Sequence, residues 1–207
     1  DADLSYCDLS KANLRNTIFY GANLKGAKLC QANFENSNFL FAELCNSNLS
    51  DSDLQNANFA GANLQYAKLM RTILSNADLS AVSFVRAQLG GAVFLEANLM
   101  GTDFGDIEGP VDFSYANLYE TYFVGETLFC PCFEGANLED SNFAYADMIN
   151  ADFSNANLSG ANFYKARLYR ANLFNAKCTG TFFYRTDFDD ADLSDVDLTD
   201  AILKPIQ

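Results

Sequence analysis

The stretch Ala57-Asn58-Phe59-Ala60-Gly61 is followed directly by Ala62-Asn63-Leu64-Gln65-Tyr66, and the two have the same five-residue pattern. A large apolar residue, called the centre from here on, occupies the third position, and Ala stands two positions before it. Centres recur at every fifth position from Leu4 to Phe104, and again from Phe113 to Leu203. Such self-similarity has to be interpreted before any local prediction of helix or strand.

The repeat is regular in composition as well as in spacing. The first run holds 21 blocks and the second 19, and 23 of these 40 centres are Leu and 15 are Phe. The position two before the centre is small in all blocks except those with Glu126 and Pro131, and the position just before it is Asn or Asp in 25 blocks. A spacing of five fits neither the helical period of 3.6 nor the strand period of two. It predicts short segments, each with two inward residues, separated by regular corners.

From Ala2 to Leu203 these blocks resemble the pentapeptide-repeat family, whose pattern is A(D/N)Lxx. The resemblance implies an all-β fold, a right-handed quadrilateral parallel β-helix with four blocks per coil. The centre and the small residue then point inward, and the other three positions point outward. We therefore expect one domain over residues 1–207, with about ten coils and regular repeats at 2–104 and 111–203. Strand-like stacking makes the rod on the order of 48 Å long.

Two places depart from the repeat. Residues 105–110 read Gly-Asp-Ile-Glu-Gly-Pro, which is turn chemistry, and nine residues separate Phe104 from Phe113. We interpret this as four residues more than a normal step, and expect a short irregular loop near 105–112. The loop is either a small bulge or a recognition loop with Asp106, Ile107 and Glu108 as contacts.

The second departure is the inward slot at Glu126. A carboxylate there is costly unless the backbone turns it outward, so we expect a distorted coil from Gly125 to Cys132.

Four blocks per coil place residues that are 20 apart in one column. Arg15 should then lie over Glu35, and Asp51 over Arg71, as surface pairs worth at most ~1 kcal/mol each. From Phe113 to Leu168 the centres alternate between Phe and Leu or Met. This alternation predicts Phe stacks on two opposite faces of the core.

Composition excludes several classes of function. The net charge of −14 disfavours direct nucleic-acid binding, which needs Lys and Arg at the phosphates. The chain has no His, the commonest general base at neutral pH, and no Gly-rich phosphate loop. Cys130-Pro131-Cys132 lacks a second ligand pair for a metal. We therefore predict no enzyme activity, cofactor or metal, and no apolar run approaches the ~20 residues of a membrane span.

Aromatic and basic residues gather at outward positions of the C-terminal half. Since Tyr and Arg dominate protein-contact hot spots, this group is the candidate partner surface. The alternative is a set of ladders that shield the coil, with Arg167 between Asp147 and Asp187 and Arg170 over Asp190. The candidate surface consists of Tyr164, Lys165, Tyr169, Arg170, Phe174, Tyr184 and Arg185.

Two functions from different classes follow. The first is a non-enzymatic structural or interaction scaffold that presents a rigid acidic surface to an unidentified protein partner. The second is a DNA-mimicking modulator of DNA gyrase or topoisomerase, which similarity to the quinolone-resistance members of the family implies. This chain is more regular than those members and lacks their long loop and C-terminal helix. Its net charge is also half of the ~28 charges that a 48 Å DNA duplex carries.

Assembly and compartment are expectations of the same kind. With no capping helix in the sequence, we expect a monomer or end-to-end association through uncapped coil ends. Outward thiols at Cys30 and Cys45 favour a reducing compartment such as the cytoplasm. The thylakoid lumen or another targeted compartment is the alternative if an N-terminal segment has been removed.

Overall fold

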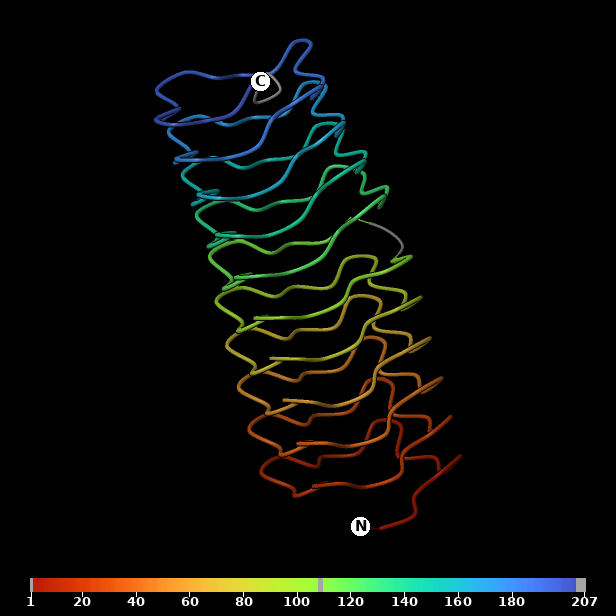
Figure 1. Ribbon diagram of the computed structural model, residues 1–207. Coiled ribbons are helices and arrows are strands. Elements are labelled where there is room, and N and C mark those ends of the chain that lie inside the picture. The colour runs from red at the N-terminus through yellow and green to blue at the C-terminus, as the bar shows by residue number, and fades with distance from the viewer. Residues whose placement is uncertain (1, 108–109, 204–207) are drawn as a thin grey trace.

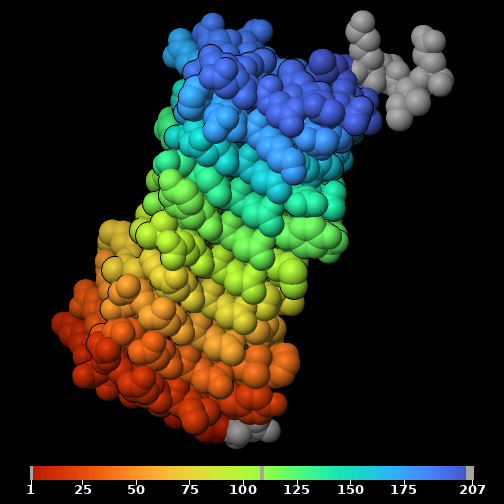
Figure 2. Space-filling model, turned by 90° about the vertical axis from the view of Figure 1, so that its left-hand side faces the viewer, coloured from red at the N-terminus to blue at the C-terminus, as the bar shows by residue number. Residues whose placement is uncertain are grey.

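The computed structural model describes residues 2–107 and 110–203, which wind into a right-handed quadrilateral β-helix (Figure 1). Within these ranges there is no helix and no strand of several residues, because each side of a coil pairs with the next coil through one residue. Asn38, for example, pairs in parallel with Ile18 in the preceding coil and with Asn58 in the following one. The coils stack into a rod (Figure 2). The fold predicted from the five-residue repeat is confirmed.

Backbone hydrogen bonds run mainly between coils. The N–H of Leu44 donates to the carbonyl of Asn63 in the next coil at 2.9 Å, and the N–H of Glu43 donates to Ala22 in the previous coil at 3.0 Å. The N–H of Ser47 closes the corner on the carbonyl of Leu44 at 3.0 Å. Each block thereby satisfies its backbone polar groups with neighbouring coils, as a buried backbone requires.

The preference for Asn or Asp before the centre has a local cause. The carboxamide oxygen of Asn33 accepts the N–H of Glu35 at 2.9 Å, and the carboxylate of Asp152 accepts the N–H of Ser154 at 2.9 Å. This side-chain-to-backbone turn spans the centre and starts the corner.

The second residue after each centre has left-handed backbone geometry. Asn36, Tyr66 and Arg86 all have φ of +59°. A left-handed conformation costs roughly 1 kcal/mol or more in a residue other than Gly. The cost is offset because the same residue donates its N–H to the next coil, as Tyr66 does to Val85 at 3.0 Å.

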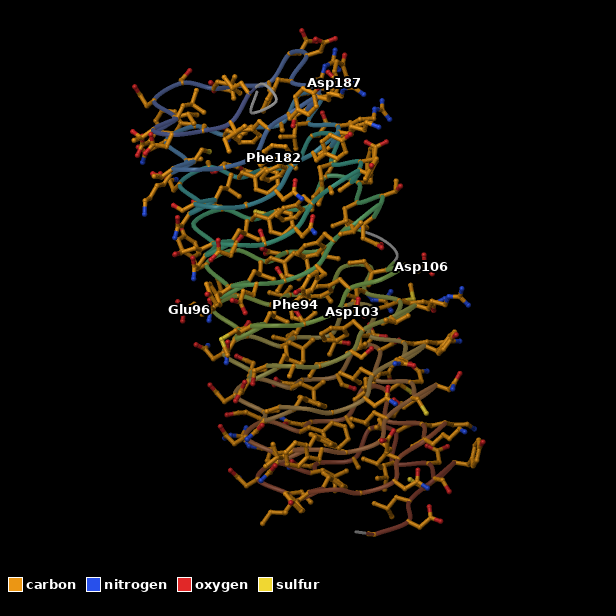
Figure 3. All side chains as sticks on the ribbon, viewed as in Figure 1. Phe94, Glu96, Asp103, Asp106, Phe182 and Asp187 are labelled. Atoms are coloured by element: carbon orange, nitrogen blue, oxygen red, sulfur yellow. The ribbon has the colours of Figure 1, made fainter. Side chains whose placement is uncertain are left out.

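The core consists of the centres and the small residues. Phe94 lies inside its coil, whereas Glu96, two residues later, projects from the edge of the rod (Figure 3). Phe123 stacks on Phe143 at 4.9 Å between ring centroids, and Phe133 meets Phe143 edge to face across the core at 5.8 Å. The two opposite Phe stacks predicted from the alternation of centres are confirmed.

The irregular segment is where the sequence placed it, but its interpretation as four extra residues is wrong. Paired residues are 20 apart at Ser83–Asp103 and at Asp112–Cys132, but 19 apart at Val93–Asp112. The segment is therefore a fourth side of a coil that is one residue short, since the nine-residue step is one block of five and one of four.

The predicted contact residues of this segment fare differently. Asp106 is exposed at the edge of the rod (Figure 3), where its carboxylate pairs with Arg86 at 3.1 Å. Ile107 is buried in the slot of a small inward residue, so its role as a surface contact is corrected. Glu108 lies outside the described residues.

Glu126 stays inward, contrary to the expectation that the backbone turns it out. Its side chain is buried, and its two carboxylate oxygens accept the N–H of Asp106 at 2.9 Å and of Ile107 at 3.2 Å. In a regular coil the corresponding N–H groups donate to backbone carbonyls, as Gly101 does to Tyr119. Glu126 thus supplies acceptors to the corner of the shortened coil, which repays part of its burial.

The coil around Glu126 is less distorted than expected. Pairing at Asp112–Cys132 and Thr127–Asp147 keeps the normal 20-residue separation. The one local change is a bend at residues 129–130 in place of the usual corner turn, directly before Pro131. The carboxylate is accommodated by its hydrogen bonds, so the backbone does not have to rearrange.

The predicted surface columns are present. Arg15 pairs with Glu35 at 2.6 Å, and Arg71 pairs with Asp51 at 2.7 Å. At the other end of the rod, the last centres are only partly covered. Leu193, Leu198 and Leu203 border an apolar hollow of about 250 Å³ there.

Candidate interaction surface

One corner of the C-terminal coils carries aromatic rings and cations together. We call it the aromatic–cation corner and define it as Tyr145, Tyr164, Lys165, Tyr184 and Arg185. Tyr164 and Tyr184 stack one coil apart at 5.9 Å, and Tyr145 meets Tyr164 edge to face at 5.3 Å. The repeat brings these rings together because each follows a centre directly or by two residues in successive coils.

The two cations of this corner are held by rings. The ammonium group of Lys165 lies 5.3 Å from the ring centre of Tyr145 and 5.2 Å from that of Tyr164. The guanidinium group of Arg185 lies 5.3 Å from the ring centre of Tyr184 and donates a hydrogen bond to its hydroxyl at 3.2 Å. Cation–π contacts of this kind contribute about 0.5–1 kcal/mol at exposed sites.

No carboxylate neutralises these two cations. Among residues 2–107 and 110–203, neither Lys165 nor Arg185 takes part in an ion pair. The pKa of Arg185 is raised by the hydrogen bond and the charge of Tyr184, and then by Tyr164, with no carboxylate contributing. The corner is therefore a locally positive spot on an acidic rod, and it lies between Phe182 and Asp187 in sequence (Figure 3).

Tyr169 and Arg170 occupy the next corner of the same coil. Arg170 lies over the ring of Tyr169 at 4.9 Å and pairs with Asp190 at 3.5 Å, as the columns predict. Arg167 lies on the side between the two corners and pairs with Asp147. This second corner is aromatic but electrically balanced, unlike the first.

Phe174 does not join either group. It follows the centre Leu173, in the same corner column as Leu95 and Glu96, and Glu96 projects from the edge of the rod opposite Asp106 (Figure 3). Phe174 is 43% exposed on that far side. The candidate surface of the sequence therefore divides into two neighbouring corners and one remote ring.

Tyr145 and Phe182 belong to the cluster although sequence reasoning missed both. Phe182 lies against Tyr164 at 6.1 Å and Tyr184 at 6.3 Å. The missed signal was the column rule, because Tyr145 stands 20 residues before Lys165. The same rule identifies Tyr66, Arg86 and Asp106, where the guanidinium group lies over the ring at 5.8 Å and pairs with the carboxylate.

Other chemistry-bearing groups are dispersed. The described residues contain no group of three or more His, Cys, Asp or Glu that could hold a metal ion. Burial raises the pKa of the Cys178 thiol to about 12, so this inward thiol is unreactive at neutral pH. No helix in the described part of the chain is long and apolar enough to cross a membrane.

Comparison with known proteins gives a family match over most of the chain. The model of pentapeptide repeats matches residues 1–36, 37–76, 72–106, 132–168 and 166–204. The sequence comparison with curated proteins returned no match.

Solved structures give the same result for the fold. HetL, a pentapeptide repeat protein involved in heterocyst differentiation regulation from the cyanobacterium Nostoc sp., matches with a TM-score of 0.67 and 28% identity. The match covers 98% of this chain and 91% of HetL. A pentapeptide repeat protein from the Arabidopsis thaliana thylakoid lumen is 29% identical, over 52% of this chain and 68% of that one, with a TM-score of 0.38. QnrB1, a plasmid-mediated fluoroquinolone resistance protein, is 19% identical, with a TM-score of 0.35, over 93% and 91%.

Proposed function

Since the chain belongs to the pentapeptide-repeat family, whose members are generally non-enzymatic structural repeat proteins, we propose that it is an interaction scaffold for a protein partner. The contact surface is the aromatic–cation corner. The observation that carries this proposal is the pair Lys165 and Arg185, held on tyrosine rings without a facing carboxylate.

The arrangement suits recognition for two physical reasons. Aromatic residues and Arg supply most of the energy at protein interfaces. The rings and cations are also already packed on each other and on a rigid backbone, which lowers the entropy cost of binding. HetL, which overlays on nearly the whole chain, is described as a participant in regulation, and a regulatory protein without catalysis acts through contacts.

A pull-down with matched variants tests the proposal. The baits are the wild type, a Lys165→Ala/Arg185→Ala double variant and a Phe174→Ala variant, which removes an exposed ring on the far side of the rod. We expect at least one native-source protein to bind the wild type and the Phe174 variant, and to lose at least tenfold in recovery with the double variant. Equal recovery of every bound protein by all three baits would refute the corner as the contact surface.

DNA mimicry at gyrase or topoisomerase is the competing proposal. It is supported by the acid-rich last coil, where residues 187–200 hold seven Asp and no Lys or Arg. Purified protein would be titrated into a gyrase supercoiling assay, with and without a quinolone, at two salt concentrations. Inhibition or drug protection that weakens with salt favours mimicry. No effect at any dose leaves the scaffold proposal in front.

A further inference from the structure

The rod has a notch beside the shortened coil. A hollow of about 250 Å³ opens there, with Gly91, Val93 and Val111 on its floor and Asp112, Cys130 and Cys132 on its rim. The notch has a simple cause. The coil between Val93 and Asp112 lacks one residue, and Gly90-Gly91 below it contributes no side chains to fill the space.

Two thiols with different surroundings border this notch. All six cysteines of the chain are unpaired, and Cys130 is exposed while Cys132 is half-buried. The hydroxyl of Ser114 lies 3.0 Å from the sulfur of Cys132 and donates to the carboxylate of Asp112 at 2.6 Å. Because a serine has one hydroxyl proton, the thiol of Cys132 must be the donor to Ser114. This bond fixes the Cys132 sulfur at the rim.

The number of donors selects the ligand. Thiolates select soft ions, which in proteins are chiefly Cu(I), Zn(II) and iron–sulfur clusters. Structural zinc needs four ligands and a cluster needs about four cysteines. The described residues offer no group of even three suitable side chains. Two thiols alone satisfy an ion that accepts linear two-coordination, and among these three that is Cu(I).

We propose that Cys130 and Cys132 form a two-thiolate site for Cu(I) in the notch. Each thiol loses its proton to solvent, two copper–sulfur bonds form, and the oxidation state of the metal does not change. The apolar floor excludes water and oxidants from one side of the ion. The site does not depend on the aromatic–cation corner, and the two can be tested separately.

An anaerobic competition titration tests this site. Cu(I) is shared between the protein and the coloured chelator bathocuproine disulfonate, with the wild type, Cys130→Ser, Cys132→Ser and Cys30→Ser. Cys30 is the matched control, since its thiol also lies at a corner and bonds a serine, Ser10, at 3.3 Å, but has no second thiol beside it. Circular dichroism checks that each variant is folded.

We expect one tight Cu(I) per wild-type chain. Losing either thiol of the notch removes the chelate, so Cys130→Ser and Cys132→Ser should each weaken the affinity on the order of 100-fold or more. Cys30→Ser should leave it unchanged. The site is refuted if all three variants weaken binding equally, because copper would then bind independent thiols, or if neither variant of the notch weakens it.

Discussion

Inward hydroxyl groups show how single residues tune the core. Several Ser and Thr in the small slot donate to the carbonyl of a centre, as Ser52 does to Leu29 at 2.7 Å and Thr72 to Leu49 at 3.1 Å. The hydroxyl of Ser47 is equally buried but has no partner among the described residues. A buried hydroxyl without a partner costs free energy that Ala, the commonest residue of this slot, avoids.

This difference gives a prediction with opposite signs. Ser47→Ala should raise the free energy of unfolding, by up to about 1 kcal/mol, because it removes an unsatisfied group. Ser52→Ala should lower it by about 1 kcal/mol, because it removes a hydrogen bond. Urea denaturation of the two variants measures both. A loss of stability in Ser47→Ala as large as in Ser52→Ala would contradict the argument.

Glycines at corners are selected by the ring below them. The ring of Phe41 covers Gly61, where a Cβ would lie 2.7 Å from ring carbons. Tyr6 over Gly26 and Tyr115 over Gly135 repeat this arrangement. Where the aromatic corner residue is Tyr66 or Tyr145, the residue 20 later is instead a cation that lies over the ring.

Gly61→Ala should therefore cost more than the left-handed backbone alone explains. Gly180 is the matched control, since its φ of +68° is close to the +64° of Gly61 but nothing lies within 4 Å of an added Cβ. We expect Gly61→Ala to be about 1–3 kcal/mol less stable than Gly180→Ala, because the ring must shift. In the Phe41→Ala background this difference should vanish. Equal denaturation midpoints for the two glycine variants would show that the ring yields freely.

At the scale of the element, the shortened coil depends on one buried carboxylate. Burial, and then the charges of Asp106 and Asp103, raise the pKa of Glu126, while its two backbone hydrogen bonds lower it. The net shift is upward, so between the ordinary and the raised pKa the folded chain binds more protons than the unfolded chain. The contribution of Glu126 to stability therefore falls as the pH rises through this window.

Glu126→Gln isolates this effect, because Gln does not titrate at this position. We expect the wild type to lose stability relative to Glu126→Gln between about pH 5 and about pH 8. Paired urea denaturations at the two pH values measure the change, and the other acids cancel in the comparison. If the gap is constant or widens in favour of the wild type, the carboxylate is not destabilised by burial.

The repeat made the coil predictable, but not its phase. Inward and outward positions, the Phe stacks and the column pairs all follow from the five-residue spacing. The missing residue was hidden because a step of five from Phe104 falls on Gly109, which does not look like a centre. Glu126 was misjudged because its partners are backbone N–H groups, which carry no mark in the sequence. At the aromatic–cation corner, Tyr145 was visible only through the 20-residue column.

At the scale of the whole molecule, each coil contacts only its neighbours. Stability of such a rod is close to a sum of coil terms and interface terms. The coils differ in cover, since the centres of residues 24–178 are buried whereas Leu193, Leu198 and Leu203 are partly exposed. Local opening should therefore begin where interfaces are incomplete.

Hydrogen exchange should show this gradient. Amides in residues 188–203 and the N–H groups of Asp106 and Ile107 should exchange before those of the coils between residues 130 and 180. The first set lacks a covering coil, and the second relies on one side chain for its acceptors. Exchange read by mass spectrometry on short peptides measures the order. Uniform protection along the rod would mean that it opens only as a whole.

The single missing residue acts on the rod as a frameshift acts on a reading frame. Every column stays continuous in space, but its numbering changes from one half to the other. A coil can be duplicated or deleted within either half as a cassette of 20 residues. A cassette that spans the slip must have 19, or every inward residue beyond the joint turns out to solvent. The slip therefore divides the chain into two modules that can each be lengthened or grafted, with the joint between them as the one seam whose length has to be copied.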